Sequence, residues 1–270
     1  MAGPLPPLDS EYPLDAHAVL RFRRDGHALI RGLASREEVA AYRPHIARVL
    51  DGVAVIADRQ QRLDDYSSLF TQVTNVWRMD EAAKAFVFAR RFAQVAARLM
   101  GVGGVRLYHD QALFKEPGGA PTPWHQDQYY WPLDTEHTVT MWMALVDIPP
   151  EMGPMSFASG SHRADVASGA ISAEESARLS ALIHDRRLPV SEPTALAAGD
   201  ATFHSGRTLH SAQPNRTARR REVMTVIYYE DGVLVAHPEN PHQEVDLRVF
   251  LPGLRGGDVA DTELNPRLYP

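Results

Sequence analysis

The chain has 270 residues, of which 44% are hydrophobic and 23% are charged, so it is long enough to bury a sizeable core. Its 28 Lys+Arg and 34 Asp+Glu give a formal net charge of −6, which disfavours a nucleic-acid partner because such binding uses clustered basic residues. It contains no cysteine, so any metal must be bound by histidine and carboxylate. No apolar run reaches the ~18 residues of a membrane helix, and no basic-then-apolar leader opens the chain, so we expect a cytoplasmic protein that does not contact a membrane.

Helices are the predicted elements of the first third of the chain. Residues 1–14 carry four prolines and are expected to form a tail. Capping residues and hydrophobic periodicity then predict, in order, a helix that begins after Asp15, a strand over residues 27–31, a helix from the capping box Ser35–Glu38 to about Leu50, and helical sequence from Asp80 to Gly101. Residues 52–79 give no decisive pattern.

Strands dominate after Gly104. The extended runs are separated by Gly, Pro and Asp and lie at residues 105–115, 121–128, 138–147, 155–158, 201–204, 222–229 and 233–236. One helix interrupts them, from the capping box that begins at Ser172 to about Arg187. Runs at this spacing predict a sandwich or jelly roll with the early helices packed against one sheet. We expect one domain over residues 15–270, made of a helical part (15–104), a β-rich core (105–236) and a C-terminal extension (237–270).

The most informative motif is Pro123-Trp-His-Gln-Asp127. His125 and Asp127 are two residues apart in a predicted strand, so their side chains should project from one face and reach one ion. A third ligand is needed, and His210, 85 residues after His125, is the candidate. Two histidines and one carboxylate form the facial triad of non-heme Fe(II) oxygenases, which leaves coordination positions open. Taken alone, a His-x-Asp triplet in a strand is more often a histidine and an aspartate that form an ordinary hydrogen bond.

The order of the motifs is more specific than any one of them. The motifs follow one another as His125-x-Asp127, Thr138–Asp147, Gly153–His162, Ala198–His204, and His210 with an arginine after it. This set resembles the phytanoyl-CoA dioxygenase family of Fe(II)- and 2-oxoglutarate-dependent oxygenases. The resemblance runs from about Val105 to Tyr229, and residues 24–35 resemble that family's opening. It implies a mainly β fold with flanking helices, the double-stranded β-helix or cupin-like jelly roll.

The resemblance implies an iron site and a cosubstrate. In that family the two residues of the HxD motif and a distal histidine bind iron, which assigns this role to His125, Asp127 and His210. It also implies 2-oxoglutarate as cosubstrate and O2 as oxidant.

An arginine that begins the strand after the distal histidine binds the far carboxylate of 2-oxoglutarate in that family. Arg219, Arg220 and Arg221 compete for this role. The family pattern of Arg, any residue, small apolar, large apolar and Ser/Thr fits residues 221–225 best, so we choose Arg221. A guanidinium suits a carboxylate because it donates two parallel hydrogen bonds. For Arg216 and Arg219 a solvated charge patch is favoured.

Three further residues are candidates for the cosubstrate pocket. Trp142 lies where the family has an aromatic lining residue, on a strand whose Thr140 shares its face, although a strand tryptophan is more often a core residue. Gln111 lies on the strand before the HxD motif and could offer its amide to 2-oxoglutarate. Gln126 is a cosubstrate contact by resemblance, but strand alternation points it away from the face of His125.

Other residues near the motif keep two interpretations each. Residues 129–131 (Tyr-Tyr-Trp) could form an aromatic wall over the substrate or a packed strand end. His204 and His109 are rival third ligands, but His204 lies inside a strand rather than after a loop, so a hydrogen-bonded structural histidine is favoured. Lys115 and residues 118–119 could hold a phosphate, although a plain turn is favoured.

We expect a non-heme Fe(II)/2-oxoglutarate-dependent dioxygenase that hydroxylates an unactivated C–H bond of a small-molecule metabolite, with conversion of 2-oxoglutarate and O2 to succinate and CO2. The presence of Asp127 favours hydroxylation, desaturation, ring closure or epimerisation, since relatives that halogenate lack this carboxylate. A metal-dependent hydrolase or isomerase on the same barrel would leave Arg221 without a purpose. A non-catalytic small-acid binding module would predict a defective triad.

Overall fold

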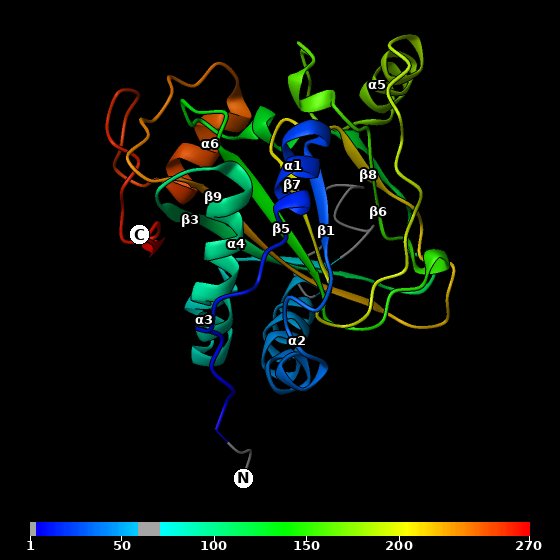
Figure 1. The fold of residues 1–270 in the computed structure, drawn as a ribbon, viewed down its shortest axis with the longest axis vertical. Coiled ribbons are helices and arrows are strands. Elements are labelled where there is room, and N and C mark those ends of the chain that lie inside the picture. Colours follow the sequence, from blue (N-terminus) through cyan, green and yellow to red (C-terminus); the bar gives the residue numbers. More distant parts are fainter. Residues whose placement is uncertain (1–3, 59–70) are drawn as a thin grey trace.

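The computed structural model describes residues 4–58 and 71–270, and in these ranges the strands form two antiparallel sheets (Figure 1). The strands are β1 (His27–Ile30), β2 (Thr71–Thr74), β3 (Val105–Lys115), β4 (Thr122–His125), β5 (Thr138–Ala144), β6 (Met155–Phe157), β7 (Ala201–Ser205), β8 (His210–Ala212), β9 (Arg221–Glu230) and β10 (Arg267–Tyr269). The larger sheet has the order β1-β7-β5-β9-β3-β10, with β2 also paired to β3, and the smaller sheet has the order β4-β8-β6.

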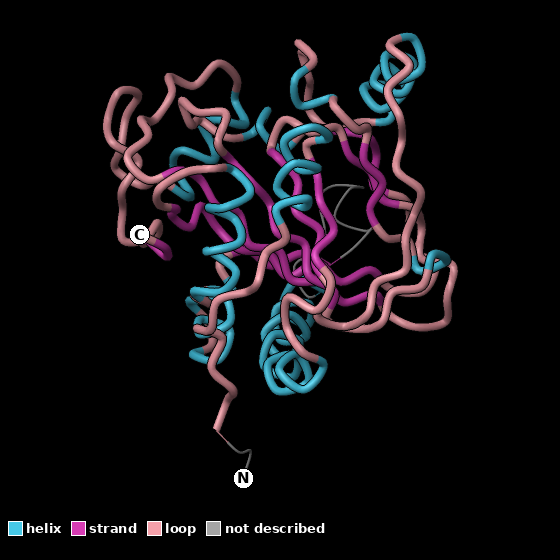
Figure 2. The backbone as a smooth tube through the Cα atoms, viewed as in Figure 1, coloured by secondary structure: helices cyan, strands magenta, loops and turns pink. Residues whose placement is uncertain are grey.

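Helices surround the strands, which run through the middle of the molecule (Figure 2). The α-helices are α1 (Ala16–Asp25), α2 (Arg36–Asp58), α3 (Glu81–Val87), α4 (Arg90–Met100), α5 (Ala173–Asp185) and α6 (Pro241–Phe250). In the described ranges none of them is long and apolar enough to cross a membrane. The predicted helix from residue 35 is confirmed but continues beyond Leu50, and the helical sequence after Asp80 divides into α3 and α4.

Local capping chemistry sets several helix ends. The Asp15 side chain accepts a hydrogen bond from the His17 backbone N–H at 3.0 Å, which starts α1. Asp80 does the same for α3 through the Ala82 N–H at 2.8 Å. Gly101 ends α4 in the left-handed conformation with φ of 77°, which an L side chain rarely adopts. These ends could be predicted because each depends on residues close together in the chain.

The two faces of the larger sheet have different surroundings. On β5, Val139, Met141 and Met143 enter a core that also contains side chains from α1 to α4. Thr140 and Trp142 on the same strand face a cavity. The strand β9 alternates in the same way, as the period of two predicts. The helices α1 to α4 therefore cover one face of the sheet and leave the other face available to form a site.

Two predicted strands differ from the structure. The strand expected over residues 121–128 ends at His125, and a 3-10 turn, η3 (Asp127–Tyr130), follows it. The extended segment expected over 233–236 forms isolated bridges rather than a strand. Gln126 between them keeps an extended backbone, with φ of −120° and ψ of 135°, so His125 and Asp127 still project from one face as alternation predicts, although Asp127 lies outside the paired strand.

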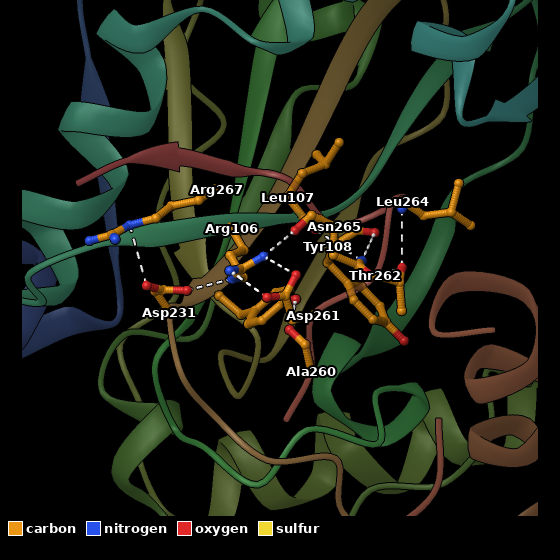
Figure 3. Close-up of polar contacts among 11 residues, drawn as sticks. Arg106, Leu107, Tyr108, Asp231, Ala260, Asp261, Thr262, Leu264, Asn265 and Arg267 are labelled. Atoms are coloured by element: carbon orange, nitrogen blue, oxygen red, sulfur yellow. Dashed lines mark hydrogen bonds and ion pairs between the residues drawn. The ribbon is translucent and has the colours of Figure 1, made fainter. Parts of the chain in front are cut away.

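A polar network attaches the C-terminal segment to β3 (Figure 3). Arg106 on β3 pairs with Asp231 and with Asp261, whose carboxylate lies 2.6 Å from the guanidinium. The Asn265 side chain donates a hydrogen bond to the backbone carbonyl of Tyr108 at 3.1 Å. The segment that follows α6 is thus held beside Tyr108, whose hydroxyl in turn contacts Asp246 of α6.

Asp110 on β3 is a buried carboxyl group with an incomplete set of partners. Its Oδ1 accepts a hydrogen bond from the Val76 backbone N–H at 2.9 Å, but its Oδ2 has no partner among the described residues. Burial raises the pKa of Asp110 to about 7, whereas an unfolded chain has a value of about 3.9. At a pH between these two pKa values, Asp110 keeps its proton in the folded protein and releases it in the unfolded chain. The free energy of unfolding therefore decreases as the pH rises through this range.

We expect Asp110→Asn to remove this component of the pH dependence. Relative to wild type, the variant's free energy of unfolding should increase from about pH 4 to about pH 7, by a few kcal/mol at about 1.4 kcal/mol per unit of pKa shift. Urea denaturation of both proteins across this range measures the difference. A difference that stays constant with pH would show that the Asp110 carboxyl does not titrate with a raised pKa.

Candidate active site

A cavity of about 530 Å³ lies between the two sheets and beneath α6. Its wall includes side chains from β3, β5, β7 and β9 of the larger sheet, from β4, β6 and β8 of the smaller sheet, and from α6. Concave sites of this size, with a few convergent polar groups, are typical small-molecule sites. Six of the predicted site residues line it: Gln111, His125, Asp127, Trp142, His210 and Arg221.

The smaller sheet brings the two histidines together. His125 ends β4 and His210 begins β8, and the two are directly opposite each other in the antiparallel register. Their ring centroids are 4.1 Å apart. Asp127 follows at the start of η3, and its Oδ1 lies 3.6 Å from His125 Nε2 and 3.5 Å from His210 Nε2. One potential ligand atom from each of the three residues lies within 4.8 Å of the other two, so all three can bind one ion.

Backbone carbonyls set the tautomer of both rings. His125 Nδ1 is 2.8 Å from the Pro123 carbonyl oxygen, and His210 Nδ1 is 2.9 Å from the Thr208 carbonyl oxygen. A carbonyl only accepts, so each Nδ1 carries the hydrogen and each Nε2 keeps a lone pair for a metal. Burial, together with the neighbouring His125 ring, also holds the pKa of His210 well below its usual range, so this ring is neutral.

The Asp127 carboxylate is held by donors from the larger sheet. Although burial by itself opposes its charge, the neighbouring His210, His125 and His204 rings hold the pKa of Asp127 well below its usual range. Thr140 Oγ1 donates to Asp127 Oδ2 at 3.0 Å, and His204 Nε2 lies 3.3 Å from the same oxygen. Asp127 is thus ionised, and its Oδ1 remains directed between the two histidines. Two imidazoles and one carboxylate fit a divalent iron ion.

His204 lies beside the triad, a position that the sequence did not predict. The expected hydrogen bond is present, because its Nε2 lies 3.3 Å from Asp127 Oδ2, but its Nδ1 has no partner among the residues that the structure describes. Its ring centroid lies 4.3 Å from that of His210. The other rival ligand, His109, instead stacks on Phe250 with centroids 4.1 Å apart. His204 is therefore a neighbour of the triad that positions the carboxylate, and His109 belongs to the wall beneath α6.

Arg221 is a buried cation without an acidic partner. It begins β9, lines the cavity and forms no ion pair with any described carboxylate. Its Nη1 donates to the Gly153 carbonyl, its Nε has no partner in the described part of the chain, and its guanidinium carbon lies 5.3 Å from the centre of the Trp142 ring. Burial lowers the pKa of Arg221 to about 10, so it stays charged at neutral pH. By contrast, Arg220 pairs with Asp51 at 2.7 Å.

Of the three other residues predicted for the cosubstrate pocket, two line the cavity and one does not. Trp142 and Gln111 line the cavity, Trp142 beside the arginine and Gln111 on the neighbouring β3. Gln126 does not line it: its Nε2 donates to the Arg207 carbonyl at 2.5 Å, so the structure does not support the expected contact with a cosubstrate. The physical reason is the one that alternation gave, since Gln126 points away from the face that His125 presents.

The aromatic run and Lys115 are also placed by the structure. Tyr130 and Trp131 line the cavity, whereas Tyr129 does not, so two of the three aromatic residues form part of the wall. Lys115 is fully buried at the end of β3, opposite Arg221 in the register, rather than on an exposed turn. Burial lowers the pKa of Lys115 to about 7. Its Nζ contacts Thr122 and the Gln213 carbonyl inside the protein, so the side chain is not exposed on the loop, and a phosphate cradle there is not supported.

Fold and site together define a class of protein. Two sheets that hold two histidines and one aspartate around one point, with an unpaired cation in the same cavity, are the arrangement of a mononuclear non-heme iron oxygenase. The model of the phytanoyl-CoA dioxygenase (PhyH) family matches residues 22–223. The chain belongs to this family, and the resemblance seen in the sequence is confirmed.

Known proteins agree with this assignment. The chain is 26% identical over 213 residues to a probable alpha-ketoglutarate-dependent hypophosphite dioxygenase of Stutzerimonas stutzeri. The aligned residues cover 75% of this chain and 74% of that protein. The structure is similar to that of the non-heme alpha ketoglutarate dependent carbocyclase SnoK from nogalamycin biosynthesis, with a TM-score of 0.77, 27% identity, and coverage of 94% of this chain and 96% of that one.

A second solved structure contains the cofactors. The epimerase SnoN, in complex with Fe3+, alpha ketoglutarate and nogalamycin RO, is similar with a TM-score of 0.74 and 27% identity over 93% of this chain and 97% of that one. The predicted jelly-roll fold is thus confirmed. The protein is an Fe(II)/2-oxoglutarate-dependent dioxygenase, an oxidoreductase. The alternatives of a metal-dependent hydrolase and a non-catalytic binding module are not supported.

Proposed function

We propose that His125, Asp127 and His210 bind Fe(II) and that Arg221 binds the far carboxylate of 2-oxoglutarate. The observation that supports this most is Arg221, because a buried cation without an acidic partner needs an anion and lies in the same cavity as the triad. Bound iron would supply the activation of O2 that oxidises a C–H bond, with 2-oxoglutarate converted to succinate and CO2.

The contribution of the chain itself is positioning and the exclusion of water. Because backbone carbonyls bind both Nδ1 atoms, both Nε2 lone pairs would be available to an iron ion, while Thr140 and His204 hold the carboxylate of Asp127. Trp142 covers the guanidinium of Arg221, so that its pairing with a carboxylate takes place away from bulk water, where the interaction is strong.

The proposed reaction is hydroxylation of a small-molecule metabolite. A cavity of about 530 Å³ must hold both 2-oxoglutarate and the substrate, which suits a compact molecule better than a macromolecule. Asp127 supplies the carboxylate that relatives which halogenate lack, which favours hydroxylation. Desaturation, ring closure and epimerisation would use the same groups and differ in the substrate.

Succinate release tests the proposal. Purified protein mixed with Fe(II), ascorbate and 2-oxoglutarate should form succinate slowly, and faster with a compound from a metabolite panel that is oxidised in proportion. A control with Zn(II) in place of Fe(II) should form none. Hydrolysis or isomerisation of a compound with Zn(II) and without 2-oxoglutarate would contradict an oxygenase. Binding of 2-oxoglutarate without any succinate would indicate a binding module.

We further propose that residues 15–270 act as one domain. Side chains of α1 to α4 share a single core with β5, β7 and β9, which supports the helical part and the β-rich part as one unit. The C-terminal extension supplies α6 to the cavity wall. The substrate site would then need all three parts of the chain.

A further inference from the structure

The helix α6 presents one face to the cavity. Its cavity-lining residues are spaced three and four apart along the helix, as neighbours on one face must be: His242, Val245, Asp246, Val249 and Phe250. Val245 and Val249 are 46% and 44% exposed, which is unusual for large apolar side chains beside a cavity. An apolar ligand in the mouth of the cavity would cover them.

The same helix is attached to the turn that carries Asp127. The side chains of Asn240 and Gln243 donate hydrogen bonds to the Tyr129 carbonyl at 3.2 and 3.3 Å. The His242 ring packs edge-on against Tyr130, with centroids 5.3 Å apart. Since Tyr129 and Tyr130 belong to η3, which begins at Asp127, α6 is held in a fixed position relative to the triad.

Asp246 is the acidic group on this otherwise mainly apolar face. Tyr108 donates a hydrogen bond to its Oδ2 at 3.1 Å, while no described residue donates to its Oδ1. No arginine, lysine or histidine in the described ranges forms an ion pair with it, and burial raises its pKa to about 7. A half-buried carboxyl group with one free oxygen is unfavourable by itself and is stabilised by a donor, most strongly by a cation.

We propose that Asp246 is a substrate-recognition residue that binds a cationic amine, while the apolar body of the same molecule packs against Val245 and Val249 of α6. The cavity then has two recognition groups of opposite charge, with Arg221 for an anion and Asp246 for a cation. This specifies the substrate class and rests on the proposed function, since it takes this cavity to be the place of oxidation.

An amine fits the observations better than an alcohol or an acid. Arg221 is the one arginine or lysine among the described residues of the wall, and it sits beside Trp142 rather than on α6. A second anion near Asp246 would be repelled. A neutral alcohol could donate one hydrogen bond, but a charge-assisted bond from an ammonium is about twice as strong.

The test compares two probes of the same shape. The first probe is 4-phenylpiperidine, which is cationic at neutral pH, and the second is 4-phenyltetrahydropyran, its neutral ether counterpart. Calorimetric titration measures the affinity of the protein for each probe without iron or 2-oxoglutarate. We expect wild-type protein to bind the amine at least about tenfold more tightly. Asp246→Asn should bring the two affinities within about threefold of each other. Glu244→Gln removes one charge from an exposed position of the same helix and should leave the wild-type ratio unchanged.

A second variant keeps the test independent of how well Asp246→Asn folds. Val249→Lys places an ammonium one turn from Asp246 at a half-exposed position, so it should pair with the carboxylate and weaken the amine at least about tenfold while the ether is less affected. Equal affinities in wild type, no detectable amine binding, or a ratio unchanged in both variants would overturn the inference. Lack of succinate with an intact probe ratio would instead overturn the proposed function alone.

Discussion

His210→Ala is expected to abolish 2-oxoglutarate turnover and to weaken Fe(II) binding more than about 100-fold, because only His125 and Asp127 would remain as ligands. Both remaining groups are already positioned by other contacts, so they cannot move to replace the lost imidazole. Anaerobic titration with Fe(II), and with Co(II) as a spectroscopic reporter, measures the affinity. Succinate formation measures the turnover.

The comparison with His204 makes this result specific. His204→Gln keeps a side-chain N–H donor for Asp127 and should reduce metal affinity by about tenfold, as loss of a supporting contact does. His184→Ala, at a side chain that is 91% exposed on α5, should change nothing. If the His204 variant lost the metal and the His210 variant kept it, His204 would be the third ligand and our choice between the rivals would be wrong.

The convergence of the triad could be predicted from the sequence, but its geometry could not. The order of motifs along the chain predicted which residues meet. The expected common face of His125 and Asp127 is present, because Gln126 between them keeps an extended backbone, although strand pairing ends at His125 and η3 begins at Asp127. What holds the arrangement is the pairing of β4 with β8, a long-range register that the local pattern of either strand does not encode.

His204 was missed for a related reason. It lies opposite Thr140 in the pairing of β5 with β7, and these two residues together hold the Asp127 carboxylate. The sequence shows a histidine in a strand, which by itself has many interpretations. Its role becomes visible only when the register between the two strands is known.

The helix α6 had a local signal that the sequence analysis did not use. Asn240 caps it by accepting hydrogen bonds from His242 and Gln243, and Pro241 occupies the first helical position, which is a typical start. Its docking over the cavity was not predictable. That docking depends on side-chain contacts with Tyr129, more than a hundred residues earlier, and with Tyr108 on β3.

Removal of the cation by Arg221→Met is expected to raise the Kd for 2-oxoglutarate by roughly 100-fold, which corresponds to about 3 kcal/mol for loss of a buried charge partner. Without 2-oxoglutarate the variant should be at least as stable as wild type, because an unpaired buried charge is replaced by an apolar group of similar length. Calorimetry of 2-oxoglutarate binding to Mn(II)-loaded protein and thermal unfolding of the metal-free protein measure the two quantities.

Arg220→Lys provides the matched control for Arg221→Lys. The guanidinium of Arg220 pairs with Asp51 and Glu222 outside the cavity, so its replacement should leave 2-oxoglutarate binding unchanged. Arg221→Lys keeps the charge but cannot donate two parallel hydrogen bonds, and it should weaken binding by less than Arg221→Met does. An Arg221→Met variant that binds 2-oxoglutarate normally but unfolds at lower temperature would show that the guanidinium serves the fold, through Gly153 and Trp142, and that another residue holds the cosubstrate.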